Sequence, residues 1–290
     1  MKKIVFCALL CFSFLGKAQV GTTIINKEMS NGVQSCYELS IEDVVHKEVR
    51  KSWIKKMDGF TKEKPKLGDL DMEFYDVKIS NLKFDSINVI SRILQRDKSV
   101  IIQTFFETEN GFVSDSGDFD KSHEYILDMM NDFGKETYNG HYLKKVGVQN
   151  KVLKKRMGEL SSLNNEVVKQ TKLINKRESG IRNNKADIVN VLKQIDMSKT
   201  QVLDQSTVVS QLSATASTYK SESKKLKSLQ RKSDKLISKK ASLEKEIHKF
   251  ENQIESAKVA IEQAKLDIKS KEIEIKDENS KLSGLNKKII

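Results

Sequence analysis

The chain has 290 residues, with 52 basic and 40 acidic residues, a formal net charge of +12, one proline and three cysteines. After residue 18, no apolar stretch approaches the ~20 residues of a membrane-spanning helix, which excludes an integral helical membrane protein. From Lys151 to the end the chain has 31 basic and 18 acidic residues, so nearly all of the excess positive charge lies in the second half. Such asymmetry indicates either an anionic partner or a solvated basic helix surface.

The first 18 residues have the three parts of a secretory signal peptide. Lys2 and Lys3 precede an apolar run from Ile4 to Leu15, and the small residues Gly16 and Ala18 follow. We therefore expect an exported protein, periplasmic or extracellular, for which nucleic acid is not an expected partner. Cleavage leaves Cys36 as the sole cysteine, which excludes an internal disulfide framework and favours a small buried residue over an intermolecular bridge or a reactive thiol.

Residues 19–147 are predicted to form a small α+β domain. Val45, Val49, Trp53 and Met57 recur at four-residue spacing and indicate a helix over 43–57. Alternation over 72–79 predicts a strand, and INVISRIL and SVIIQTFFE predict a hairpin around QRDK. A helix starting near Asp118 or Asp120 would turn Ile126, Met129, Met130 and Phe133 inward. Gly134, Gly140 and Gly147 follow, so we expect a bend or joint near Gly147.

A heptad repeat dominates from residue 153 onward and predicts a coiled coil over 148–290. Apolar residues recur every seven positions at Leu153, Leu160, Val167, Ile174, Ile181, Ile188, Ile195, Val202 and Val209. A straight helix drifts about 20° per strict heptad, so this stripe requires supercoiling around a partner helix. We expect the positions four residues later to complete the seam, the stripe of residues that contacts the partner helix. These positions are mostly polar: Met157, Asn164, Thr171, Glu178, Lys185 and Leu192.

A second and richer heptad register follows in the last third of the chain. Its main positions are Leu226, Ser233, Lys240, Ile247, Ile254, Ile261, Ile268, Ile275, Leu282 and Ile289. The positions three residues later are apolar from Leu229 to Ala264, polar at Lys271 and Glu278, and apolar again at Leu285. This segment is the expected partner of the first one, through intrachain pairing or self-association.

The two registers are separated by QSTVVSQLSATASTY, residues 205–219, which carry no charge. Val209 and Leu226 are not a multiple of seven apart, and Ser and Thr compete with helical backbone hydrogen bonds. We expect the tip of an antiparallel helical hairpin here, with arms at 148–204 and 220–290. The alternative is one continuous helix in which the heptad register shifts by three residues. The absence of Gly and Pro from this segment favours that alternative.

No catalytic or metal-binding motif is recognisable. His46, His123, His141 and His248 are far apart and match no metal-ligand spacing, and no cofactor is indicated. DSGDFDKSHE, residues 115–124, lacks the glycine and glutamate of a calcium loop, so its carboxylates are read as helix caps. We therefore expect a protein that is not an enzyme.

The sharpest charge feature is the segment 220–240, with nine basic and two acidic residues. It would bind a phosphate-bearing lipid or wall polymer, or else form a solvated coiled-coil exterior. The candidate anion-binding residues are Lys224, Lys225, Lys227, Arg231, Lys232, Lys235, Lys239 and Lys240.

The stretch from IIQTFFETENGFVSD through YILDMMNDFGKETYNGHYLKKV into the heptads resembles uncharacterised exported bacterial proteins with a small α+β domain and a C-terminal coiled coil. This resemblance implies no activity and no functional residues. The expected role is structural or scaffolding in the cell envelope. The alternative is a holdase, because a basic exported hairpin is similar in outline to the Skp (OmpH-like) periplasmic chaperones, from which the large N-terminal domain departs.

Overall fold

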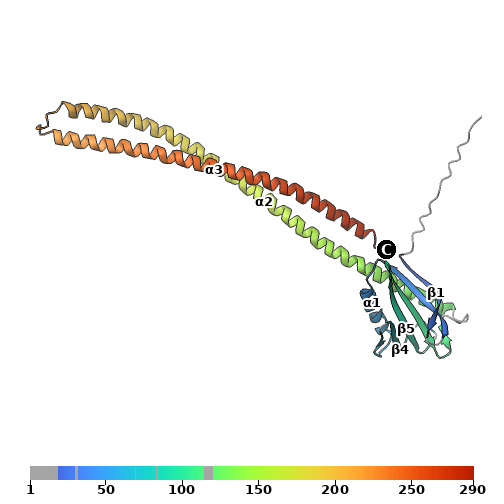
Figure 1. Cartoon of the computed structure of the whole chain (residues 1–290). Helices are drawn as coiled ribbons and strands as arrows, with labels where there is room; N and C mark the ends of the chain where they lie inside the picture. Colours follow the sequence, from blue (N-terminus) through green and yellow to red (C-terminus); the bar gives the residue numbers. More distant parts are fainter. Residues whose placement is uncertain (1–18, 30–31, 69, 83, 114–119) are drawn as a thin grey trace, which may run out of the picture. The chain divides into compact units, whose positions relative to one another are not determined.

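The computed structural model describes residues 19–29, 32–68, 70–82, 84–113 and 120–290 (Figure 1). The predicted signal peptide at 1–18 and the predicted cap at Asp118 lie outside these residues. The described chain divides into two compact units. We call the first, residues up to Asn150 with Ser280–Ile290, the head, and the second, Lys151–Asn279, the hairpin.

The head is built on one antiparallel sheet, which confirms the α+β fold class. Its seven described strands run in the order β1-β2-β6-β5-β4-β3, and β7 pairs with β6. The bounds are β1 Val20–Met29, β2 Gly32–Glu42, β3 Lys66–Leu67, β4 Asp71–Val77, β5 Ile87–Arg96, β6 Ser99–Thr108 and β7 Gly111–Phe112. The β5–β6 hairpin is the one predicted around QRDK. The β1–β2 pair was not predicted, since no strand was expected before the first helix.

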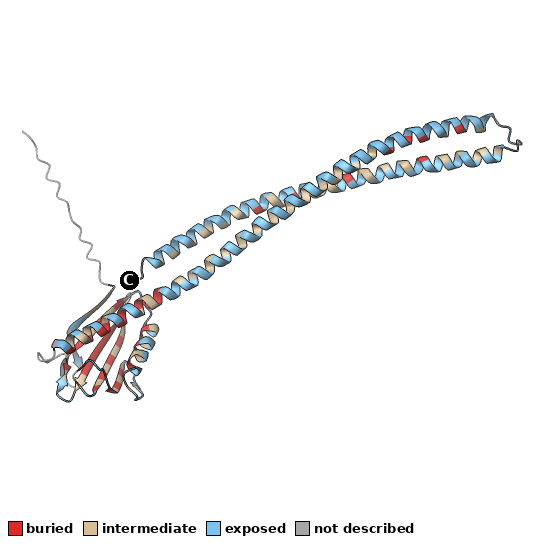
Figure 2. Ribbon diagram, turned by 180° about the vertical axis from the view of Figure 1, so that it is seen from behind, coloured by how far each residue is buried: buried red, intermediate tan, exposed pale blue. Residues whose placement is uncertain are grey.

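Helix α1 (His46–Asp58) and the first turns of helix α2 (Asp120–Gln211) pack on one face of this sheet (Figure 2). Trp53 of α1 donates a hydrogen bond from Nε1 to Ser91 Oγ on β5 at 2.9 Å, and its ring lies 4.9 Å from that of Phe133 on α2. Val49, Trp53 and Met57 are buried as predicted, whereas Val45 lies at the N-cap of α1 and is 49% exposed.

Helix α2 remains helical through Gly134, Gly140 and Gly147, so the joint expected near Gly147 is not an interruption of the helix. Gly134 has a packing role instead. A Cβ at this position would lie 2.4 Å from Val20 Cγ1 and 2.9 Å from Leu39 Cδ1, because the helix approaches β1 and β2 closely.

The two helices confirm the predicted antiparallel hairpin, and the alternative of a continuous rod is wrong. Helix α3 (Tyr219–Asn286) packs against α2 along the chain's second half (Figure 1). From Arg156 to Asn184 on α2, the contacted residues move from Glu274 back to Glu246 on α3, by the same number of residues. The pairing therefore continues without a slip over whole heptads.

Burial along α3 follows the predicted register, including its polar members. Ser233 is buried, and Lys240, Lys271 and Glu278 are half-buried among their apolar neighbours. On α2 the main series from Leu153 to Val209 is also confirmed, but its companion positions are not. Asn164, Thr171, Glu178 and Lys185 are exposed, as are Met157 and Leu192.

The seam of α2 is completed three residues after each main position instead of four. These residues are Arg156, Leu163, Gln170, Arg177, Asn184, Val191, Ser198, Gln205 and Leu212, all buried or half-buried. Most of them are polar, so the apolar seam of α2 is narrower than that of α3.

Candidate interaction site on the hairpin

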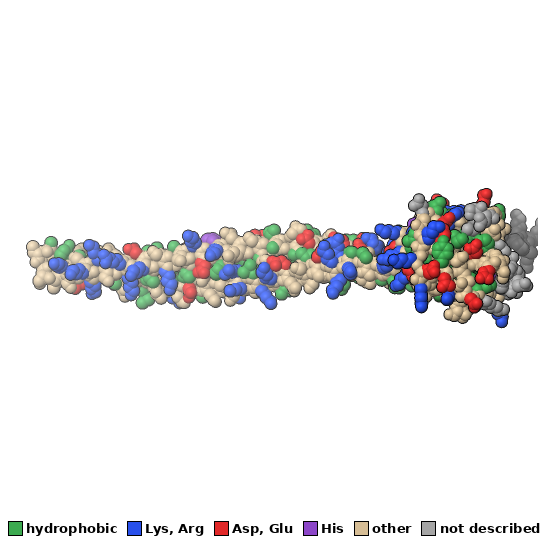
Figure 3. Space-filling view, turned by 90° about the horizontal axis from the view of Figure 1, so that it is seen from below, with side chains coloured by type: hydrophobic (Ala, Val, Ile, Leu, Met, Phe, Trp, Pro, Cys, Tyr) green, Lys and Arg blue, Asp and Glu red, His purple; other side chains and the backbone are tan. Residues whose placement is uncertain are grey.

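The basic segment predicted at 220–240 forms the first turns of α3, directly after the hairpin turn. Seven of the eight candidate residues are exposed, and Lys240 alone is half-buried, because it occupies a main seam position. Figure 3 shows Lys and Arg side chains close to the uncharged turn on the face in view.

Helical spacing arranges the exposed cations in two groups. Lys225, Lys232 and Lys239 are seven residues apart and therefore form a row that flanks the seam. Lys224, Lys227, Arg231 and Lys235 follow one another at three- or four-residue spacing and share the outward face. The positive charges are thus held by one rigid helix at regular intervals.

Few carboxylates neutralise this surface. Glu222 accepts a hydrogen bond from Gln205 Nε2 of α2 at 2.7 Å, and Lys225 Nζ lies 3.9 Å from the same carboxylate. Lys240 forms an ion pair with Glu244 at 2.6 Å. Among the described residues, the other six candidate cations form no ion pair. Because this charge is not balanced within the chain, it is available to an anionic partner.

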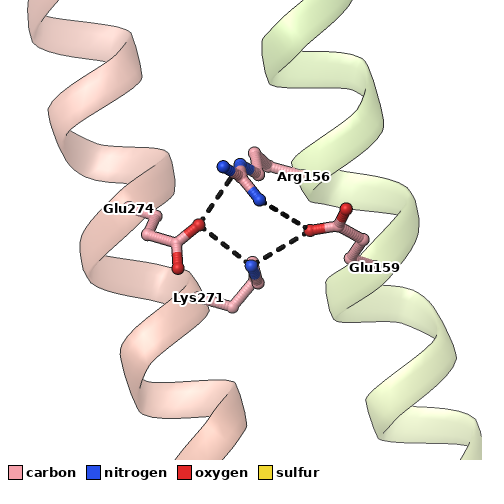
Figure 4. Close-up of polar contacts among 4 residues, drawn as sticks. All are labelled: Arg156, Glu159, Lys271 and Glu274. Carbon is pink, nitrogen blue, oxygen red and sulfur yellow. Dashed lines mark hydrogen bonds and ion pairs between the residues drawn. The ribbon is translucent and has the colours of Figure 1, made fainter.

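The opposite end of the hairpin differs in this respect. Four charged residues form a closed ring between the arms (Figure 4). Arg156 contacts Glu159 at 3.1 Å and Glu274 at 3.2 Å, and Lys271 contacts Glu159 at 3.0 Å and Glu274 at 2.9 Å. Hydrogen bonds from Lys271 and Arg156 lower the pKa of Glu159 below its ordinary range. Within this ring each cation is matched by carboxylates, so the four side chains together have no net charge.

The turn at 212–218 lies within the predicted uncharged segment, whose first part is still helical in α2. Ser213 Oγ is 2.8 Å from Thr215 Oγ1 and 3.4 Å from the backbone nitrogen of Thr215. These hydroxyl contacts replace helical backbone hydrogen bonds, which is how a Ser/Thr cluster ends a helix without Gly or Pro.

The four histidines make separate contacts. His46 Nε2 is 3.1 Å from Ile93 O, His123 Nδ1 is 2.6 Å from Tyr37 Oη, and His248 Nδ1 is 3.1 Å from Glu251. His141 and Glu48, 93 positions apart in the chain, are brought together at 2.8 Å, a pairing that no local sequence pattern predicts. Within the described ranges, no group of three or more His, Cys, Asp and Glu residues could hold a metal ion.

None of the described helices combines the length and apolar character needed to cross a membrane. Comparison with protein-family models and with curated proteins finds no match to this chain. The resemblance to exported coiled-coil proteins accordingly stays a prediction from the residues that suggested it, and no residue role is transferred from a relative.

Proposed function

We propose that this is an exported, non-enzymatic interaction protein of the cell envelope that binds a phosphate-bearing anionic component through the basic segment 220–240. The observation that carries the proposal is the set of six exposed cations without an ion pair in the described structure, held on the first turns of α3. Export is supported by the signal-like residues 1–18.

The charge arrangement suits a repetitive polyanion better than a small ligand. The exposed cations extend over several turns of one helix, and none of them lines a cavity found among the described residues. A partner with regularly spaced phosphates would contact several of them at once, whereas a single phosphate would meet only one or two. Each such contact is exposed, so binding should weaken as salt is raised.

The intrachain pairing of α2 and α3 supports a scaffold role for the hairpin. Both heptad seams are occupied within the chain, so the basic surface does not depend on a second copy for its support. A surface held on a self-supported helix keeps its spacing when the partner binds, which reduces the ordering cost of binding.

Co-sedimentation with vesicles tests the proposal. We expect the full chain to bind phosphatidylcholine vesicles containing phosphatidylglycerol, to release them as salt is raised, and to ignore vesicles of phosphatidylcholine alone. Competition by soluble polyphosphate would identify phosphate chemistry in general as the target, and retention on the vesicles in its presence would identify a lipid surface.

A matched pair of variants separates the segment from the overall charge. Replacing Lys224, Lys227, Arg231 and Lys235 by Gln should reduce vesicle affinity by about tenfold or more, since each exposed contact contributes a modest share. Replacing the exposed Lys172, Lys176, Arg182 and Lys185 of α2 by Gln removes the same charge and should have a much smaller effect. Equal losses in both variants, or binding that salt does not change, would contradict the proposal.

A further inference from the structure

The head contains a cleft of about 610 Å³ between α1 and the first part of α2. Phe60 and Phe133 contribute apolar wall, and Ser52 and Thr137 contribute hydroxyl groups. Lys55 and Lys56, at the C-terminal end of α1, stand at its edge, the first exposed and the second half-buried. The cleft therefore combines an aromatic surface with adjacent positive charge.

Glu48, His141 and Lys144 form a polar cluster in the same wall. His141 Nδ1 is 2.8 Å from Glu48 Oε2, and Lys144 Nζ is 3.1 Å from Glu48 Oε1. Both hydrogen bonds lower the pKa of Glu48, which keeps its carboxylate ionised and paired with His141 and Lys144. The negative charge of Glu48 is therefore largely compensated by Lys144 in the same wall.

His141 has an unfilled hydrogen-bonding position. The residue is 9% exposed, and its Nε2 has no hydrogen-bond partner among the described residues. A buried polar nitrogen without a partner costs free energy. This nitrogen is also closed off from solvent, so a ligand in the cleft does not reach it. The ring instead holds Glu48 in place in the wall of the cleft through Nδ1.

We propose that this cleft binds a small organic acid, with its carboxylate held by Lys55 and Lys56 and its apolar body against Phe60 and Phe133. A carboxylate pairs with the cations at the edge through charge-assisted hydrogen bonds. The other carboxylate in the lining, Glu136, is exposed, so three lysines face two glutamates, of which Glu48 is already paired.

This site is independent of the proposed function, because the cleft and the basic segment belong to different units and share no residue. Its ligand class is also different. A polyanion is matched by an open row of cations, whereas a partly enclosed cleft with aromatic walls selects a small molecule with one charged end.

Trp53 provides a local reporter, because it is the chain's only tryptophan and its ring contacts Phe133 of the cleft wall. Titration of the full chain with 4-phenylbutyrate should change Trp53 fluorescence to saturation. The uncharged 4-phenyl-1-butanol should bind about tenfold more weakly, as expected for loss of a charge-assisted interaction.

Two variants complete the test. K55A/K56A should raise the dissociation constant for 4-phenylbutyrate by about tenfold, and K47A/K51A, which removes the same charge from exposed positions of α1 outside the cleft, should leave it nearly unchanged. Lys55 is exposed and Lys56 half-buried, so K55A/K56A should leave the fold of the head intact. A signal that does not saturate, equal binding of acid and alcohol, or equal weakening in K47A/K51A would overturn the proposal.

Discussion

Phe250 of α3 lies directly against Gly180 of α2. A Cβ added at Gly180 would be 2.7 Å from Cε2 of the Phe250 ring, closer than carbon atoms pack. The guanidinium group of Arg177 lies 4.9 Å from the centre of the same ring, so the aromatic side chain is confined on two sides. At this point the arms approach so closely that only a hydrogen fits on the α2 side.

We predict that Gly180→Ala destabilises the hairpin even though alanine is the better helix former. Alanine contributes about 1 kcal/mol relative to glycine in a free helix, but overpacking costs roughly 1–3 kcal/mol. Urea unfolding followed by circular dichroism should show a net loss of about 1 kcal/mol. Gly158→Ala, where nothing lies within 4 Å of the added Cβ, should instead increase stability. A stabilised Gly180→Ala would show that the ring moves freely.

The heptad register could be predicted because a seven-residue repeat is local information. On α3 the apolar residues were dense enough to fix both seam positions, including the polar Ser233 and Lys271. On α2 the residues three and four positions after each main position are both mostly polar. Composition could not decide between them, and the choice depends on which side of α2 the partner arm covers.

Contacts between residues that are far apart in the chain could not be predicted from the sequence. The pairing of Glu48 with His141 arises because α1 and α2 share one face of the sheet, which no local pattern encodes. The β1–β2 pair had a usable signal, since Tyr37, Leu39 and Ile41 alternate and are all buried. The alternation spans only five residues, and β1 before it mixes polar and apolar residues without strict alternation, so the signal for this strand pair is weak.

Cys36 should be unreactive in the folded protein. Burial, with a smaller contribution from Glu38, raises the pKa of its thiol from 9.0 to about 11. At about pH 8 only about one molecule in a thousand then has a thiolate, and a thiol reagent must also reach a fully buried side chain. A chain starting at residue 19 should react with Ellman's reagent only slowly until denaturant is added.

The control for this prediction is the same chain carrying Cys36→Ser and Ser161→Cys, which moves the sole thiol to an exposed position on α2. This variant should react at the rate of a free thiol with or without denaturant. Equal rates for the two folded proteins would show that Cys36 is accessible in solution.

Deleting matched heptads tests the cross-arm register. Residues 160–166 of α2 face residues 264–270 of α3, given the pairs Glu159–Lys271 and Asn184–Glu246. Removing both segments should cost little stability beyond the lost length, because every remaining pair keeps its partner. Removing either alone shifts the pairs on one side of the deletion by a whole heptad, about 10 Å along the helix axis, and should lower the midpoint of thermal unfolding much further. Similar midpoints for the single and matched deletions would contradict the fixed register.

The ring of Arg156, Glu159, Lys271 and Glu274 should make hairpin stability depend on acid pH (Figure 4). Hydrogen bonds from Lys271 and Arg156 lower the pKa of Glu159 in the folded state below its ordinary value of 4.5. A carboxylate with a lowered folded-state pKa stabilises the fold fully above its unfolded-state pKa and loses this effect as pH falls through the folded value.

Glu159→Gln should therefore lower the midpoint of thermal unfolding near neutral pH, and the difference from the parent should shrink as the pH falls below 4.5 and vanish below the lowered folded-state pKa. Added salt should also reduce it, because the four side chains are partly exposed and their interactions are screened. Glu166→Gln on the same helix is the matched control, since the hydrogen bond and ion pair of Glu166 go to Gln170 and Lys169 of its own arm, and no polar contact with α3 is found among the described residues. A Glu159→Gln effect that persists unchanged at acid pH would show that the side chain stabilises the hairpin by packing, because packing contacts do not depend on its charge.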